Sequence, residues 1–340
     1  MTGLPAPKVG LLLAGEGMPL ADLIDLGVAA EDAGFDSVWH VEIQREPIVP
    51  LTAIAARTKR IRLGTGVAIW ARSPILASLV AANLDELSGG RFLYGLGTGP
   101  PEWNRRFHGM GYERPVLRIR EYVDVMRGAW KAAHDGSTFD YDGELYRVEG
   151  YQRSLRQARE RIPIVLAAVQ ERMCELAGEV ADGVLFNVLS TPRYVREFAL
   201  PNMERGAARS GRSVGDVERA AAITAAVDAD RQQACRWARH QIAFYSVIPY
   251  FDVMFRLHGF EQEATAIRDA AGRSDPAGMI AAVSEEMVDT FAIAGTPDQC
   301  REQLSAWGVL DVAVLFPPTF QLSDEEIVTN HRTLLETFAA

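Results

Sequence analysis

Residues 85–99 read Asp-Glu-Leu-Ser-Gly-Gly-Arg-Phe-Leu-Tyr-Gly-Leu-Gly-Thr-Gly, and this stretch indicates the fold more clearly than any other. The Gly89-Gly90 pair is typical of a helix end, and the apolar residues after it predict a short buried strand. That strand runs into glycines, where a backbone can approach a ligand closely. A similar strand at 61–69 also contains glycines, and Ser73-Pro74 after it predicts an N-cap and a first helical residue. Two such strands in succession predict one binding site at one edge of a parallel sheet.

Strand and helix patterns alternate along the whole chain, which is the signature of a parallel sheet with crossover helices. Residues 134–160 predict a turn or hairpin insertion after the fourth strand, and residues 230–290 predict several helices between the seventh and the eighth. No linker divides the series, so we expect a single domain over residues 1–340, with the α/β fold of a (β/α)8 TIM barrel. The eight predicted strands are 9–13, 36–41, 61–69, 92–96, 164–168, 184–186, 217–227 and 310–315.

The composition of the chain argues against nucleic-acid-binding, membrane and secreted proteins. The chain has 340 residues, of which 48% are hydrophobic and 24% charged, and its net charge of −10 argues against nucleic acid as a partner. No apolar run approaches the roughly 18 residues of a membrane span, and the first residues lack the order of a secretory signal. The three cysteines, Cys174, Cys235 and Cys300, form no C-x-x-C motif, so neither disulfides nor a metal site is expected. We therefore expect a cytoplasmic protein.

In a barrel of this kind the active site lies at the carboxyl ends of the strands. A dinucleotide site of the Rossmann type is not expected there, because it needs G-x-G-x-x-G at the opening of a helix and an acidic residue about 20 positions later. Here the glycines run into Pro100-Pro101, and Asp124 falls inside a predicted helix. The residues expected to converge at the carboxyl ends are Glu42, Gln44, 65–70, 97–102, 167–170 and Asn187.

Several segments resemble the bacterial luciferase-like family of flavin- and deazaflavin-dependent oxidoreductases, in the order and at the intervals of that family. The resemblance spans nearly the whole chain and implies a luciferase-like barrel. The stretches 42–47, 72–74 and 105–107 resemble a subgroup that uses coenzyme F420, a deazaflavin that carries hydride; FMN is the alternative cofactor. The segments that carry the family resemblance are AGFDSVW (33–39), LGTGV (63–67), LDELSGGRF (84–92), GLGTG (95–99), LAGEVADGV (176–184) and AGTP (294–297).

The resemblance also implies which residues hold the cofactor. It places a cis peptide between Gly66 and Val67, followed by Ala68, as a bulge behind the ring. It places Gly97-Thr98-Gly99 beside the side chain of the cofactor, and the loop Ala167-Ala168-Val169-Gln170 at its phosphate. A helix that begins near residue 171 would present free N–H groups to that phosphate. From the residues alone, an ordinary strand end or turn remains the alternative at each position.

Glu42 is the best ionisable candidate for acid–base chemistry, because burial beside a ring raises the pKa of a carboxylate. A hydrogen-bond anchor for the cofactor or for a loop is an alternative role. His40 lies two residues earlier on the same strand and can reach the site, or it can be a buried structural histidine.

Two positions depart from the pattern of the family. Related deazaflavin enzymes often have a histidine where this chain has Ile43, and many have a glutamate where it has Pro100. We expect Glu102 or Asn104 to take over the function of that glutamate through a small shift of the loop.

Aromatic and polar residues near the two glycine-rich strands are candidates for the substrate pocket: Trp70, Trp103, Phe107 and Asn187. Aromatic side chains at such positions can also simply fill the barrel mouth. We therefore expect an F420-dependent oxidoreductase that transfers hydride to or from a small organic substrate, and that forms a homodimer. The alternatives are an FMN-dependent monooxygenase that uses oxygen and a partner reductase, and a flavin-binding protein without catalysis.

Overall fold

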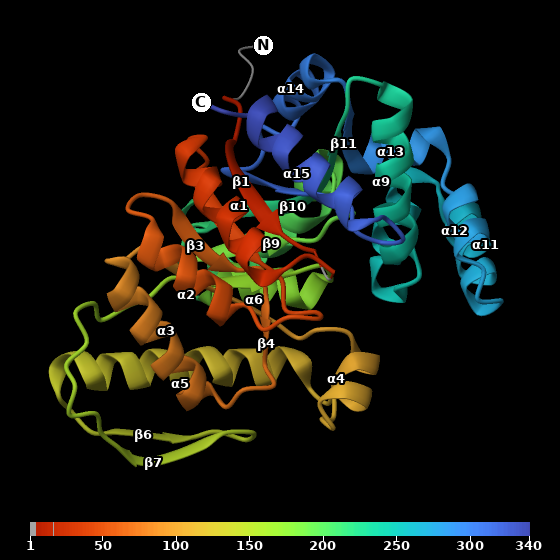
Figure 1. The fold of residues 1–340 in the computed structure, drawn as a ribbon. Coiled ribbons are helices and arrows are strands. Elements are labelled where there is room, and N and C mark those ends of the chain that lie inside the picture. The colour runs from red at the N-terminus through yellow and green to blue at the C-terminus, as the bar shows by residue number, and fades with distance from the viewer. Residues whose placement is uncertain (1–4, 16) are drawn as a thin grey trace.

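A computed structural model describes residues 5–15 and 17–340, and it contains a closed barrel of eight parallel strands wrapped by helices (Figure 1). The barrel strands follow one another in chain order, and the last pairs with the first. The predicted (β/α)8 barrel is therefore confirmed. The strands are β1 (Lys8–Leu13), β2 (Ser37–His40), β3 (Arg62–Thr65), β5 (Phe92–Gly97), β8 (Ile164–Ala167), β9 (Gly183–Phe186), β10 (Glu218–Val227) and β12 (Val312–Phe316).

Helices cover the outside of the barrel, where their apolar faces pack on the strands. Ser73 caps the helix after the third strand by accepting a hydrogen bond from Leu76 N, and Gly89 ends this helix with a φ of 68°. Both ends agree with the sequence prediction. The helices of the barrel series are α1 (Leu20–Asp32), α2 (Ile48–Arg57), α3 (Pro74–Ser88), α4 (Pro101–Phe107), α5 (Pro115–Asp135), α6 (Glu171–Val180), α7 (Pro192–Tyr194), α8 (Leu200–Arg209), α14 (Pro297–Ser305) and α15 (Asp324–Thr337).

The first insertion is a hairpin, as predicted for residues 134–160. Its strands, β6 (Phe139–Asp142) and β7 (Arg147–Tyr151), are antiparallel and lie below α5 in Figure 1. The buried carboxylate of Glu121 on α5 accepts hydrogen bonds from the three consecutive backbone N–H groups of 144–146. This carboxylate fastens the hairpin turn to the helix.

The second insertion is helical, as predicted for residues 230–290, but it leads into a strand that the sequence pattern does not predict. This strand, β11 (Ala292–Gly295), pairs with Thr224–Val227 at the carboxyl end of β10. Its four residues are too short a run to show a strand period, and β10 supplies its pairing edge. The helices of the insertion are α9 (Arg231–Ser246), α10 (Asp252–His258), α11 (Glu261–Gly272), α12 (Pro276–Ala281) and α13 (Glu285–Phe291).

A bulge interrupts the third strand of the barrel beside β5. Gly64 of β3 pairs with Leu93, and β4 (Ala68–Ile69) pairs with β5 again where Ala68 faces Leu96. Three residues separate Gly64 from Ala68, whereas two separate Leu93 from Leu96. The bulged strand therefore contains one extra residue between these two pairs. Such an extra residue bends a strand and re-aims the residues that follow it.

Glycines of β5 make room for this bulge. A Cβ atom on Gly95 would lie 1.7 Å from the Thr65 carbonyl oxygen, and one on Gly97 would lie 2.6 Å from a methyl carbon of Val67. The Thr65 hydroxyl donates a hydrogen bond of 2.7 Å to the Gly95 carbonyl oxygen. The peptide between Gly66 and Val67 is cis, as the family resemblance implies. The G-x-G pattern of β5 thus serves first to fit the bulge against the sheet.

The barrel interior beneath the bulge is filled by side chains. Trp39 lies there with its Nε1 donating to Ser37 Oγ at 2.9 Å, and a Cβ on Gly64 would lie 2.2 Å from its indole ring. At the opposite end of the barrel, Arg62 pairs with Glu218 at 2.9 Å, which links the starts of β3 and β10. A ligand site therefore has to lie above this packed interior, at the carboxyl ends of the strands.

Substitution of Gly95 by alanine tests the bulge. The added methyl group would overlap the Thr65 carbonyl oxygen, so Gly95→Ala is expected to lower the free energy of unfolding by about 1–3 kcal/mol. Gly272→Ala is the matched control, because nothing lies within 4 Å of its Cβ position at the end of α11. Urea denaturation of both variants measures the difference. Equal stability of the two variants would contradict the close approach of the bulge to β5.

Candidate active site at the carboxyl ends of the strands

A cavity of about 440 Å³ opens at the carboxyl ends of the strands, within the size range of small-molecule sites. Its lining is mostly apolar, and among the described residues Glu42 and Arg172 supply its charged side chains. The sequence-predicted site residues that line this cavity are Glu42, Gly66, Val67, Gly97, Thr98, Gly99, Trp103, Ala167, Val169, Gln170 and Asn187. Segments that are far apart in the chain thus converge where the barrel fold requires.

Three predicted site residues lie behind the cavity wall instead. Ala68 and Ala168 are buried and do not line the cavity. Trp70 is 1% exposed, its Nε1 donates to Asn104 Oδ1 at 2.5 Å, and its ring packs on Tyr112 at 5.3 Å. The prediction that Trp70 walls the substrate pocket is therefore corrected: the indole supports the loop that follows β5.

The expected substitutes for a loop glutamate also lie elsewhere. Glu102 projects from α4 into solvent and pairs with Arg105 at 2.7 Å, so its predicted catalytic placement is corrected. Asn104 is buried and donates to the Thr98 carbonyl oxygen at 2.7 Å, which makes it part of the loop framework. Phe107 is 67% exposed and does not line this cavity.

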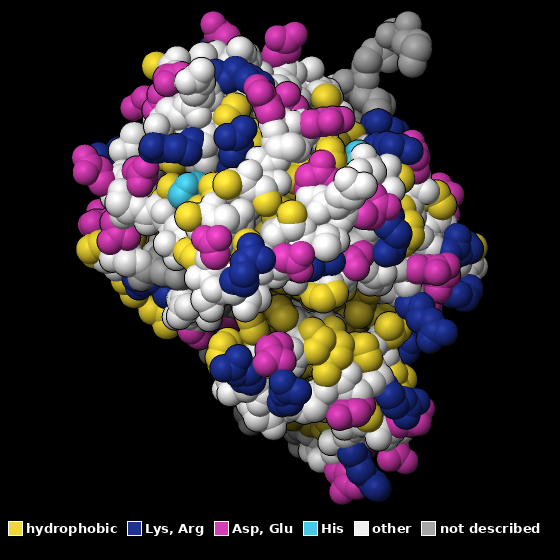
Figure 2. All heavy atoms as spheres, turned by 90° about the vertical axis from the view of Figure 1, so that its right-hand side faces the viewer, with side chains coloured by type: hydrophobic (Ala, Val, Ile, Leu, Met, Phe, Trp, Pro, Cys, Tyr) yellow, Lys and Arg dark blue, Asp and Glu magenta, His cyan; other side chains and the backbone are white. Residues whose placement is uncertain are grey.

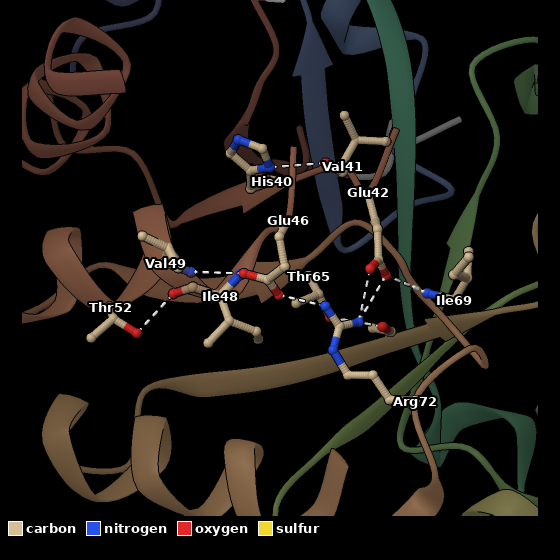
Figure 3. A network of polar contacts seen from close by, with 11 residues as sticks. His40, Val41, Glu42, Glu46, Ile48, Val49, Thr52, Thr65, Ile69 and Arg72 are labelled. Atoms are coloured by element: carbon tan, nitrogen blue, oxygen red, sulfur yellow. Dashed lines mark hydrogen bonds and ion pairs between the residues drawn. The ribbon is translucent and has the colours of Figure 1, made fainter. Parts of the chain in front are cut away.

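Glu42 is held at the cavity by two donors (Figure 3). Its carboxylate accepts a hydrogen bond of 2.7 Å from Ile69 N and lies 2.8 Å from Arg72, which also pairs with Glu46 at 2.6 Å. Burial raises the pKa of Glu42, and the charge of Arg72 opposes the rise. Because Ile69 lies in β4, this carboxylate ties the end of the second barrel strand to the bulge.

The loop after β5 is held by a short chain of hydrogen bonds. The Tyr112 hydroxyl donates to Thr98 Oγ1 at 2.8 Å, and both residues line the cavity. Gly99 has a φ of 61°, which turns the chain into α4. The sequence interpretation missed Tyr112, because it lies in an irregular stretch and meets Thr98 only through the fold.

The start of α6 follows β8, which β3 and β5 separate from β2 and Glu42 in the barrel, so it borders another side of the cavity. Gln170 precedes this helix, and its Nε2 donates to the Tyr250 carbonyl oxygen of the second insertion. Arg172 is exposed, lies in the first turn of α6, and has no ion pair among the described residues. Asn187 lines the same cavity with its Oδ1 buried and without a hydrogen-bond partner in the described chain. Arg172 was not predicted, although its place one residue after the predicted helix start was a usable signal.

A second cavity of about 610 Å³ adjoins the first, and His40 lines it. The two cavities share Val41, Ile43 and Trp103 among their lining residues. His40 is 2% exposed, and burial lowers its pKa to about 4, with a smaller contribution from the nearby charge of Arg45. The imidazole is therefore neutral near pH 7, and it lies apart from the Glu42 carboxylate (Figure 3).

The sequence of residues 4–310 matches the model of a protein family described as luciferase-like monooxygenase. The chain belongs to this family. The match covers the first seven barrel strands and ends just before β12, and the predicted family membership is confirmed.

Individual proteins are also similar to this chain, and the similarity covers most of both sequences. A 5,10-methylenetetrahydromethanopterin reductase of Archaeoglobus fulgidus is 33% identical over 88% of this chain and 92% of its own length. A putative coenzyme F420-dependent oxidoreductase of Mycobacterium tuberculosis is 31% identical over 91% of this chain and 94% of its own. An uncharacterised protein of the same species is 33% identical over 91% of this chain and 93% of its own.

Solved structures agree in fold. The coenzyme F420-dependent tetrahydromethanopterin reductase of Methanopyrus kandleri superposes with a TM-score of 0.80 at 26% identity, over 99% of this chain and 100% of that one. The FMN complex of a Baeyer–Villiger monooxygenase from Pseudomonas putida reaches 0.68 at 17% identity, over 98% of each chain, which shows the shared barrel.

Two further features bear on the class of site. Within residues 5–15 and 17–340, no group of three or more histidine, cysteine, aspartate or glutamate side chains is placed to hold a metal ion. None of the helices in these ranges is long and apolar enough to cross a membrane.

Because His40 is neutral in the folded protein, we expect the free energy of unfolding to depend on pH in acid. The histidine takes up a proton near pH 6.5 in the unfolded chain but only near pH 4 in the folded one, so acid favours unfolding between these values. At pH 5 this difference corresponds to about 2 kcal/mol. His40→Gln is therefore expected to lose about 2 kcal/mol less stability than the wild type between pH 7 and pH 5, as measured by urea denaturation. Parallel losses in the two proteins would show that His40 is not buried and neutral.

Proposed function

We propose that this protein is a coenzyme F420-dependent oxidoreductase that transfers hydride between the deazaflavin and a small organic substrate. Two relatives above 30% identity, matched over 92% and 94% of their own lengths, are named a 5,10-methylenetetrahydromethanopterin reductase and a putative coenzyme F420-dependent oxidoreductase. The observation that carries the proposal is the distribution of charge in the first cavity. An apolar slot has an unpaired arginine, Arg172, beside the start of a helix on one side, and a carboxylate on another.

The residues present fit a flat ring with an anionic side chain. An apolar slot suits a planar tricycle, and a helix start together with a guanidinium suits a phosphate. The buried Oδ1 of Asn187 lacks a partner within the described chain and can accept a hydrogen bond from a ring N–H. Side chains on Gly97 would collide with the bulge, so the strand at this point presents bare backbone to the cavity. Gly97, Thr98, Gly99, Asn187 and Arg172 are therefore the residues proposed to hold F420.

When bound, F420 supplies the hydride donor or acceptor at its C5 atom. The contribution of the chain is to hold two reactants at contact distance in a cavity whose apolar walls exclude water. We assign Glu42 a positioning role, because both of its oxygens are engaged by Arg72 and one of them also by Ile69 N. The carboxylate fixes the bulge on which the ring would rest.

Titration of the purified protein with F420 and with FMN, followed by fluorescence quenching, tests the cofactor. We expect saturable F420 binding that Arg172→Gln weakens about tenfold or more, because a charge-assisted hydrogen bond to phosphate is lost. Arg332→Gln is the control, since this exposed arginine on α15 lines neither cavity. FMN binding without an F420 response would favour the monooxygenase alternative. F420 binding without turnover of a panel of carbonyls, imines and enones would favour a binding protein.

Glu42→Gln tests the positioning role. Loss of the charge that faces Arg72 should loosen the bulge and weaken F420 binding about tenfold, because the lost interaction is charge-assisted. Glu46→Gln is the matched control: Glu46 pairs with the same arginine but does not line the cavity, so F420 affinity should change by less than about twofold. A Glu42→Gln protein that binds F420 normally but turns over 10²–10⁴-fold more slowly would instead assign proton transfer to Glu42.

A further inference from the structure

A buried tyrosine holds the loop between β8 and α6. Tyr194 of α7 is completely buried, and its hydroxyl donates a hydrogen bond of 2.7 Å to the Val169 carbonyl oxygen. Val169 and Gln170 of the loop line the first cavity, whereas Tyr194 lines neither cavity. The tyrosine therefore holds the loop without belonging to the wall that a ligand would touch.

The first cavity is reached from another side of the loop. Figure 2 shows hydrophobic side chains gathered in a hollow on the side of the molecule where α4 lies below the insertion helices. Both of these elements contribute to the lining of the first cavity, through Trp103 of α4 and Tyr250 of the insertion. Because Tyr194 is closed off from this space, any effect of its hydroxyl on ligand binding has to pass through the loop.

The hydrogen bonds around Tyr194 have a fixed direction. A carbonyl oxygen only accepts, so the single hydroxyl proton of Tyr194 is engaged by Val169. The Sγ atom of Cys174 on α6 lies 3.8 Å from the Tyr194 oxygen, and the thiol is therefore the donor in that contact. Burial raises the pKa of the Tyr194 hydroxyl well above its usual range and that of the Cys174 thiol to about 12. Both groups thus keep their protons near pH 7, and Tyr194 links α6 to the loop that precedes it.

Tyr194 is itself held beside the barrel. Its backbone N–H donates to Thr191 Oγ1 at 3.0 Å, which caps α7. Its ring stacks on that of Phe198 at 5.4 Å and meets the ring of Phe186 edge-on at 6.0 Å. Because Phe186 is the last residue of β9, these contacts fix the hydroxyl relative to a barrel strand.

The carbonyl that Tyr194 holds sets the direction of a backbone N–H. In a trans peptide the C=O and N–H of one unit point in opposite directions. The Gln170 N–H belongs to the same trans peptide as the Val169 carbonyl, so it points away from Tyr194 and has no partner in the described chain. No side chain caps α6, because the Gln170 amide donates to the Tyr250 carbonyl oxygen instead. A free N–H at an uncapped helix start favours an anionic group.

We propose that Tyr194 is a positioning residue for the cofactor, and that it aims the Gln170 N–H at the phosphate by holding the Val169 carbonyl. This inference rests on the proposed function, because F420 is the ligand that brings the phosphate. Its role differs from that of Arg172, which supplies charge through an exposed side chain.

Two ligands that share a ring test this proposal: F420, and the deazaflavin riboside that lacks the phosphate and the tail beyond it. Tyr194→Phe keeps the ring but leaves the Val169 carbonyl without its donor. We expect this variant to bind F420 about three- to tenfold more weakly in fluorescence titrations, the range of one net hydrogen bond, and to bind the riboside as the wild type does. Tyr122→Phe is the matched control, because Tyr122 is equally buried and lines neither cavity, and both affinities should stay unchanged.

A second measurement uses the wild-type protein alone. Hydrogen exchange followed by NMR should show that saturating F420 slows exchange of the Gln170 amide, and that the riboside does not. Gln170 exchange that F420 leaves unchanged would overturn the proposal, as would a Tyr194→Phe protein that loses affinity equally for both ligands or for neither. Failure of the proposed function would appear separately, as the absence of any F420 response in the wild-type titration.

Discussion

The close packing of the bulge between β3 and β4 against the bare backbone of β5 is the constraint on which the site depends. The Thr65 carbonyl oxygen occupies the space that a side chain on residue 95 would need, and Val67 occupies the space beside residue 97. The bulge contains one extra residue, and beyond it β4 pairs with β5 again and presents Ile69 N to Glu42. The two glycines of β5 thus shape the wall of the first cavity and allow the bulge that anchors its carboxylate.

The charges of the first cavity are arranged differently on two of its sides. The negative charge of Glu42 is paired with Arg72, whose guanidinium also pairs with Glu46. This part of the cavity therefore presents no unpaired charge to a ligand. Arg172 has no ion pair among the described residues, and it lies in the first turn of α6, where the helix dipole also favours an anion. An asymmetric slot of this kind orients a ligand that carries its negative charge at one end. This charge distribution suits F420, which has an anionic side chain and appears in the name of a relative.

The second cavity depends on side chains from the second insertion, from α4 and from the loop after β12. Phe244 and Tyr245 come from α9, Phe320 comes from the loop after β12, and Trp103 and Phe107 come from the helix after β5. His40 also borders this cavity, and its Nδ1 is held by the Val41 carbonyl oxygen. The barrel therefore provides the position of the two cavities, whereas the insertion and the loops provide the chemical character of the second.

The sequence by itself determined the order of the barrel strands, the barrel class, the family and the strand ends at which the first cavity opens. It did so because strand ends, the Ser73 cap and the Gly89 stop are local signals, and because carboxyl ends of parallel strands must meet. Only the tertiary structure decided that Trp70 and Asn104 support a loop and that Glu102 faces solvent. It alone also showed that Arg172 and Tyr112 reach the cavity, and that β11 pairs with β10. These features depend on contacts between side chains from distant segments, and a local sequence pattern does not predict such contacts.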